Sequence, residues 1–136
     1  MFLFDTDIIS HIISKNPSSV LCNRLNEIPP EYQFTTTITV GELIYGAYKN
    51  SLKKDVLLEK LSNMVWPNIK VLSFDKPSAY VYGELRAEME RKGTPIGEPD
   101  LRIAAIALSN RMVLITRNVK HFERIPGLSI QNWLAS

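Results

Sequence analysis

The sequence predicts an α/β domain in which helices cover both faces of a mainly parallel sheet. Short apolar runs of strand length alternate along the chain with longer segments whose apolar residues recur at helical spacing. Strands joined by helices favour right-handed crossovers, which place parallel strands side by side between helical layers. The 136 residues contain no linker, repeat or low-complexity tract, so we expect a single domain spanning residues 1–136.

Five short runs are typical of strands. The first and fourth are apolar, and the second is rich in threonine, which suits a pleated backbone. The expected strands cover residues 2–4, 34–38, 69–72, 113–115 and 128–130.

The longer segments carry apolar residues three and four positions apart, as amphipathic helices do. Pro29 and Pro30 end one of these helices, whereas Pro77 starts another that Gly93 ends. The expected helices include residues 8–13, 19–26, 43–48, 57–65, 77–92 and 103–108.

Four polar residues stand where an apolar segment ends or a helix begins. Asp5 follows the first strand and Asn118 follows the fourth, while Glu42 and Asp100 each open an amphipathic helical stretch. Sites in open α/β sheets form outside the carboxyl ends of the strands, so we expect these four side chains to converge. Three carboxylates brought together repel one another unless a cation lies between them. The pattern therefore favours a hard divalent metal ion.

Each of the four residues also has a purely structural interpretation. Asp5 and Asp100 can cap the helices that follow them, because a carboxylate accepts backbone N–H bonds at a helix N-terminus. Thr39 and Glu42 fit the capping-box pattern, in which each side chain bonds to the backbone of the other. Asn118 can be a simple turn former at the end of its strand. These interpretations do not exclude a shared metal site.

Other chemistry is poorly supported by the sequence. The residues of the 93–100 loop include two glycines and two prolines, which fix an unusual backbone path ahead of Asp100, and Glu98 in this loop has no assigned role. His11 and His121 have no partner spacing for a metal or nucleophile site and are expected at the surface. There is no glycine-rich phosphate loop and no serine or cysteine nucleophile motif.

A cluster of carboxylates with Mg²⁺ or Mn²⁺ suits phosphodiester cleavage. These ions favour oxygen ligands and are usually held by one or two carboxylates together with water and substrate phosphate. They acidify water into a nucleophile and neutralise charge that develops on the phosphate. Without metal, mutual repulsion should raise the pKa values of the carboxylates, and metal binding should stabilise the fold.

The net charge of +2 is too small to mark a nucleic-acid-binding protein by itself. Two basic runs nevertheless could contact a phosphate backbone, or could simply be solvated helix faces. One run is Lys49, Lys53 and Lys54, and the other is Arg86, Arg91 and Lys92.

Composition indicates a soluble cytoplasmic protein. Hydrophobic residues make up 45% and charged residues 22% of the chain, as in ordinary globular domains. The single cysteine, Cys22, allows no intramolecular disulfide, which suits a reducing compartment. Asp5 and Asp7 interrupt the apolar N-terminus, so no signal peptide is expected, and no apolar run is long enough to cross a membrane.

Five motifs occur in the order and spacing of a known family. They are Phe4-Asp5-Thr6-Asp7, then Thr39-Val40-Gly41-Glu42-Leu43, then Gly93-Thr94-Pro95-Ile96-Gly97 leading to Asp100-Leu101-Arg102-Ile103-Ala104-Ala105, then Leu114-Ile115-Thr116-Arg117-Asn118, and finally His121-Phe122 with Pro126-Gly127-Leu128. Over nearly its whole length the chain resembles the PIN-domain ribonucleases, in particular the VapC-type toxins of bacterial toxin–antitoxin pairs.

The resemblance implies a three-layer α/β/α fold and a Mg²⁺- or Mn²⁺-dependent endoribonuclease that cleaves RNA. It implies metal ligands at Asp5, Glu42 and Asp100, a homodimer, and a small VapB-type antitoxin whose tail lies across the active-site groove. Many members of the family carry an acidic residue where this chain has Asn118, so a second tightly held metal ion is in doubt here.

Two other classes of function remain open on the sequence alone. Asp5-Thr6-Asp7 after a strand also resembles the start of the haloacid-dehalogenase-like phosphatases, but those enzymes need a downstream lysine and a further acidic motif. A PIN domain could also bind RNA or a protein without cleaving it, although the intact set of three carboxylates argues against that. Trapping an aspartyl-phosphate on Asp5 would favour the phosphatase.

Overall fold

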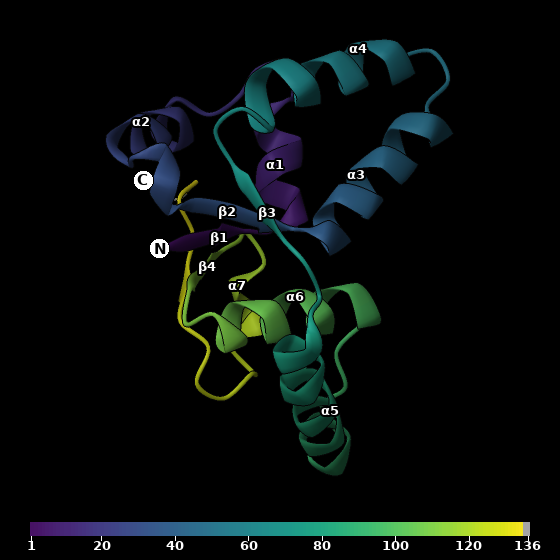
Figure 1. Cartoon of the computed structure of the whole chain (residues 1–136), viewed down its shortest axis with the longest axis vertical. Coiled ribbons are helices and arrows are strands. Elements are labelled where there is room, and N and C mark those ends of the chain that lie inside the picture. Colours follow the sequence, from purple (N-terminus) through teal and green to yellow (C-terminus); the bar gives the residue numbers. More distant parts are fainter. Residues whose placement is uncertain (135–136) are drawn as a thin grey trace.

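Five parallel strands form the centre of the protein in the order β3-β2-β1-β4-β5. The computed structural model describes residues 1–134 (Figure 1). The strands are β1 (Phe2–Phe4), β2 (Gln33–Thr36), β3 (Lys70–Leu72), β4 (Val113–Ile115) and β5 (Ile130–Gln131). Every strand pair is parallel, so the expected α/β class and the mainly parallel sheet are confirmed.

Helices lie on both sides of this sheet and complete three layers (Figure 1). The helices are α1 (Thr6–Ile12), α2 (Ser19–Glu27), α3 (Thr37–Lys49), α4 (Lys54–Lys60), α5 (Lys76–Arg91), α6 (Glu98–Ser109) and the short α7 (Val119–Phe122). A 3₁₀ turn (Pro30–Tyr32) precedes β2, and a wider helical turn (Leu61–Val65) continues α4. In Figure 1, α1 to α4 lie above the sheet and α5 to α7 below it.

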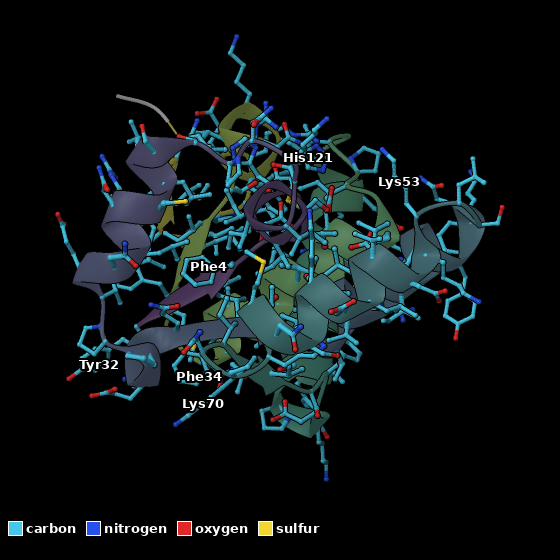
Figure 2. The ribbon with its side chains drawn as sticks, turned by 90° about the horizontal axis from the view of Figure 1, so that it is seen from above. Phe4, Tyr32, Phe34, Lys53, Lys70 and His121 are labelled. Atoms are coloured by element: carbon cyan, nitrogen blue, oxygen red, sulfur yellow. The ribbon has the colours of Figure 1, made fainter. Side chains whose placement is uncertain are left out.

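The alternation of side chains along the strands separates two apolar cores. Leu3 and Leu114 face one way and pack with residues of α5 and α6. Phe4 and Ile115, the next residue of each strand, face the other way and pack with residues of α1, α2 and the end of α4. Phe4 is completely buried and lies in the interior of the molecule (Figure 2).

The junction of β2 and α3 differs from the expectation. The predicted strand over residues 34–38 ends two residues earlier, because the Thr36 hydroxyl accepts a hydrogen bond from the Thr39 backbone N–H and caps α3. The predicted capping box of Thr39 and Glu42 is therefore wrong, since both residues lie inside the helix. Consecutive threonines made several caps possible, and the pairing of β2 with β1 and β3 selects Thr36.

Replacing Thr36 with Ala should lower the free energy of unfolding by about 1 kcal/mol, because α3 loses its N-terminal cap. Urea denaturation checks this expectation. Thr37→Ala is the matched control, since Thr37 is an exposed first residue of the same helix. Equal destabilisation by the two substitutions would show that the cap contributes nothing.

The C-terminal strand also covers different residues from those predicted. The predicted strand over residues 128–130 is instead β5 at Ile130–Gln131, where it pairs with Leu114 and Ile115 of β4. Gly127 has a φ of +78°, a conformation that suits glycine, and so turns the chain just before this strand. No helix among residues 1–134 is long and apolar enough to cross a membrane.

Candidate active site

A cavity of about 580 Å³ opens where β1 and β4 end, beside the N-terminal turns of α1, α3 and α6. Because β1 and β4 are adjacent parallel strands, the segments that follow them emerge at the same edge of the sheet. All four predicted site residues line this cavity. The lining residues are Asp5, Thr6, Asp7, Ser10, His11, Ser14, Glu42, Asp100, Arg117 and Asn118.

Asp5 is the most buried of the acidic residues here, with an exposed fraction of 5%. Its Oδ1 accepts a hydrogen bond from the Thr6 backbone N–H at 2.8 Å, which makes Asp5 the N-cap of α1. Its Oδ2 accepts one from the Thr116 hydroxyl, also at 2.8 Å, across the β1–β4 pair. Asp5 therefore caps α1 and also lines the cavity, and its carboxylate is fixed through both oxygens.

Thr6 links α1 to α3 and holds Glu42 in place. The Thr6 hydroxyl donates to Oε1 of Glu42 at 2.6 Å and lies 2.9 Å from the hydroxyl oxygen of Thr39. A hydroxyl has one proton to give, so the Thr39 hydroxyl is the donor to Thr6. Sequence reasoning did not assign Thr6 a role, and its only signal was its place between Asp5 and Asp7.

Asp100 lies in the first turn of α6, whose N-cap is Gly97, so the alternative interpretation of Asp100 as the cap of this helix is wrong. The Oδ2 of Asp100 lies 3.0 Å from Nε2 of His121, but the two atoms do not form a hydrogen bond. The expectation that His121 is a surface residue is also wrong, because its side chain is only 24% exposed. Phe122 is completely buried and anchors α7, which turns the His121 ring toward Asp100.

His11 is partly buried as well and lines the cavity, contrary to its expected surface position. Its Nε2 accepts a hydrogen bond from the Ser18 backbone N–H at 2.9 Å. This bond closes the loop between α1 and α2. The sequence carries no signal for it, since it joins a side chain to a backbone group seven residues away.

Asp7 adds a further carboxylate to the cavity. Its Oδ2 accepts a hydrogen bond from the backbone N–H of Arg117 at 3.1 Å. Its Oδ1 is buried without a hydrogen-bond partner in residues 1–134. A buried carboxylate oxygen with no partner is costly, and a cation or its water would satisfy it. Burial is also the main reason that the pKa of Asp7 is raised.

The electrostatics of the cavity favour a positive ligand. Burial first, and the charges of Asp7 and Asp100 in addition, raise the pKa of Asp5 to about 7 against the lowering effect of the Thr116 and Thr6 hydrogen bonds. At neutral pH the Asp5 carboxylate is therefore partly protonated when no metal is bound, which reduces the negative charge of the cavity. A bound cation removes this repulsion and favours the ionised carboxylates.

The donor set fits Mg²⁺ or Mn²⁺ bound partly through water. In residues 1–134, no three His, Cys, Asp or Glu side chains gather closely enough to enclose a metal ion by themselves. These two ions keep several waters and bind through one or two carboxylates plus substrate phosphate. Oxygen ligands of the type that these ions prefer are available from the carboxylates, the Asn118 amide and the unpartnered oxygen of Asp7.

Glu98, which the sequence left without a role, lies outside this cavity. The Tyr82 hydroxyl, which donates to this carboxylate, lies 2.6 Å from both of its oxygens, and Glu98 forms ion pairs with Arg86 at 3.0 Å and Arg102 at 3.2 Å. This exposed cluster joins α5 to α6. Glu98 is thus a surface carboxylate two residues from Asp100 whose polar partners in residues 1–134 are Tyr82, Arg86 and Arg102.

The fold and the cavity define a small three-layer α/β domain with an acidic site at a sheet edge, and the family follows from comparison with known proteins. The PIN domain model matches residues 2–128, and the chain belongs to the PIN-domain family. The resemblance seen in the sequence is thereby confirmed.

Within this family, the chain is similar in sequence to VapC proteins. The chain is 36% identical over 134 residues to ribonuclease VapC2 of Rickettsia felis, covering 98% of each chain. It is 37% identical over 132 residues to the tRNA(fMet)-specific endonuclease VapC of Salmonella typhimurium, covering 97% of each.

Solved structures agree with this relationship. The chain superimposes with a TM-score of 0.89 and 37% identity on a chain of DNA-bound VapBC from Salmonella typhimurium, covering 97% of both. For VapBC2 from Rickettsia felis bound to a promoter fragment, the TM-score is 0.88 at 34% identity, covering 97% of this chain and 98% of that one. FitAcB from Neisseria gonorrhoeae gives 0.88 at 29% identity over the whole of both chains.

Proposed function

We propose that this protein is a metal-dependent endoribonuclease that acts as the toxin of a toxin–antitoxin pair. The observation that carries the proposal is the convergence of Asp5, Asp7, Glu42 and Asp100 on one open cavity. The names of the relatives support it, since they are VapC ribonucleases and endonucleases matched over nearly the whole chain. The reaction is hydrolysis of an RNA phosphodiester bond with water as the nucleophile.

Asp5, Glu42 and Asp100 would hold Mg²⁺ or Mn²⁺, and Asn118 would add a neutral oxygen or hold a water at the same site. When bound, the ion acidifies water for attack and neutralises charge that develops on the phosphate. The Thr116 and Thr6 hydroxyls fix the Asp5 and Glu42 carboxylates, so little reorganisation is needed when the ion enters.

Arg117 gives the cavity a positive group for the RNA. Its side chain is exposed on the rim, and it forms no ion pair with the acidic residues in the described part of the chain. Guanidinium groups bind phosphate through paired N–H donors. We assign Arg117 to a phosphate of the RNA close to the bond that is cleaved.

The proposed partners are a VapB-type antitoxin, an RNA substrate and a second copy of the chain, all in the cytoplasm. The related VapBC structures support the antitoxin. A second, mainly apolar cavity of about 280 Å³ shares Thr6, Ser10, Ser14 and Glu42 with the acidic one. An antitoxin segment could fill it with apolar side chains and cover the carboxylates with a basic one.

The proposal is tested by incubating purified protein with total cellular RNA in Mn²⁺, in EDTA, and in EDTA followed by excess Mn²⁺. We expect cleavage with Mn²⁺, none with EDTA, and its return when the metal is restored. Intact RNA under all three conditions, after removal of any co-purified antitoxin, would favour a PIN domain that binds without cleaving.

A further inference from the structure

Two exposed tyrosines on α3 are each paired with a lysine. Tyr45 and Tyr48 are 66% and 61% exposed, so both rings are accessible to a ligand. The Lys49 ammonium lies 5.8 Å from the centre of the Tyr45 ring, and the Lys54 ammonium lies 5.1 Å from the centre of the Tyr48 ring. Each pair is a cation–π contact that holds a positive charge beside an aromatic surface.

This surface begins one turn from the candidate active site. Glu42, Tyr45 and Lys49 follow one another at spacings of three and four residues, so they share one face of α3. At 1.5 Å per residue, Lys49 lies about 10 Å along the helix from Glu42. Helices α3 and α4 project together from the body of the molecule (Figure 1), and Lys53 belongs to the turn that joins them.

This surface carries a net positive charge, and its lysines form no salt bridges within residues 1–134. Residues 45–55 contain three lysines, Lys49, Lys53 and Lys54, against one acidic residue, Asp55, for a net charge of +2. In the described part of the chain none of these lysines forms an ion pair.

The other basic run of the sequence behaves differently. Arg86 forms ion pairs with Glu90 and Glu98, and Lys92 forms one with Glu88. Two of the three cations of this run therefore already have carboxylate partners on the protein surface, whereas Arg91 forms no ion pair within residues 1–134. The structure therefore distinguishes the two basic runs by their salt bridges, a difference that the sequence alone did not show.

We propose that Tyr45, Tyr48, Lys49, Lys53 and Lys54 form a binding surface for single-stranded RNA, here called the α3 surface. The proposal rests on the ribonuclease function and identifies where its substrate extends beyond the cleaved bond. Bases stack on the tyrosine rings, and the lysines contact the phosphates that join them. Stacking tolerates any sequence, because every base has an aromatic face.

RNA fits the α3 surface better than a protein partner does. Lysine is depleted from the centres of protein interfaces, because burying an ammonium without a partner is costly. A phosphate backbone instead supplies the opposite charge and gains from counterion release. Alternation of lysine with exposed aromatic rings is the arrangement used by proteins that bind single strands.

The test is the binding of a labelled, unstructured RNA oligonucleotide in EDTA, followed by fluorescence anisotropy. EDTA prevents cleavage, so binding alone is measured. Loss of one stacked base weakens binding about tenfold or more, and we expect this for Tyr45→Leu. Tyr45→Trp should bind at least as well as the wild type, because it keeps an aromatic face. Lys53→Ala should reduce the slope of log affinity against log salt by about 0.7 for each phosphate that the variant no longer neutralises.

Tyr80→Leu is the matched control, since Tyr80 is 72% exposed on α5, on the opposite side of the sheet (Figure 1). Equal RNA affinity of Tyr45→Leu, Tyr48→Leu and the wild type would overturn the proposal, and so would variants that alter only oligomeric state or antitoxin binding. The ribonuclease function would stand if the wild type still cleaved RNA with Mn²⁺. It would fail separately if the wild type neither bound nor cleaved RNA.

Discussion

Replacing Asp100 with Asn should reduce RNA cleavage about a thousandfold or more while leaving the fold intact. The substitution keeps the size of the side chain but removes a negative charge from the carboxylate cluster. Stabilisation of developing phosphate charge by a metal ion is worth several kcal/mol, and each 1.36 kcal/mol corresponds to a factor of ten in rate. The measurement is the initial rate of RNA cleavage in saturating Mn²⁺, with circular dichroism as the check on folding.

Glu98→Gln is the matched control for this experiment. Glu98 lies two residues before Asp100 on α6 and is also a carboxylate, but its partners are Tyr82, Arg86 and Arg102 outside the cavity. The control should cleave RNA at the wild-type rate. Comparable activity of Asp100→Asn and Glu98→Gln would remove Asp100 from the site.

Replacing Asp5 with Asn should stabilise the metal-free protein at alkaline pH. The pKa of Asp5 is about 7 in the folded protein, against 3.8 for an unperturbed group. Because the folded-state pKa is raised, stability is highest while Asp5 is protonated in both states, below pH 3.8. It falls as pH rises, since the unfolded chain ionises first, and the loss is complete above about pH 7.

The difference of about three pKa units corresponds to a penalty of up to about 4 kcal/mol, which the uncharged Asn avoids. Urea denaturation in EDTA should show Asp5→Asn to be more stable than the wild type near pH 8, and the two should converge toward pH 4. A variant that is less stable than the wild type at every pH would show that the Thr6 and Thr116 hydrogen bonds to the carboxylate outweigh its burial.

Manganese should narrow this difference in stability. A ligand that binds only the folded state stabilises it by about 2.7 kcal/mol at a hundred times its Kd. The wild type should gain this stability as Mn²⁺ is added near pH 8, whereas Asp5→Asn should gain little, because it lacks one of the proposed metal ligands. An equal gain in both proteins would place the metal elsewhere.

The convergence of the site could be predicted from the sequence because it requires only that β1 and β4 be neighbouring parallel strands. Asp5 and Asn118 then reach one edge of the sheet whatever the details of packing. The helices that carry Glu42 and Asp100 have apolar faces that must cover the sheet, which places both carboxylates near the same edge.

The contacts that tune the site could not be predicted in this way. The hydrogen bond from Thr6 to Glu42 joins residues 36 apart, and the one from Thr116 to Asp5 joins residues 111 apart. Both depend on the register of the strands, which pairs Leu3 with Phe34 and with Leu114. The position of His121 similarly depends on how Phe122 packs in the core, which helical periodicity does not reveal over a four-residue helix.

The chemistry of the product ends tests the central claim most directly. RNA is cleaved in water enriched in ¹⁸O with Mn²⁺ present, and the ends are identified by mass spectrometry. Direct attack by water predicts a terminal phosphate with one solvent oxygen and no 2′,3′-cyclic phosphate at any time. Products that first carry a 2′,3′-cyclic phosphate would show attack by the RNA's own 2′-hydroxyl and would contradict the metal-dependent hydrolysis proposed for this carboxylate cavity.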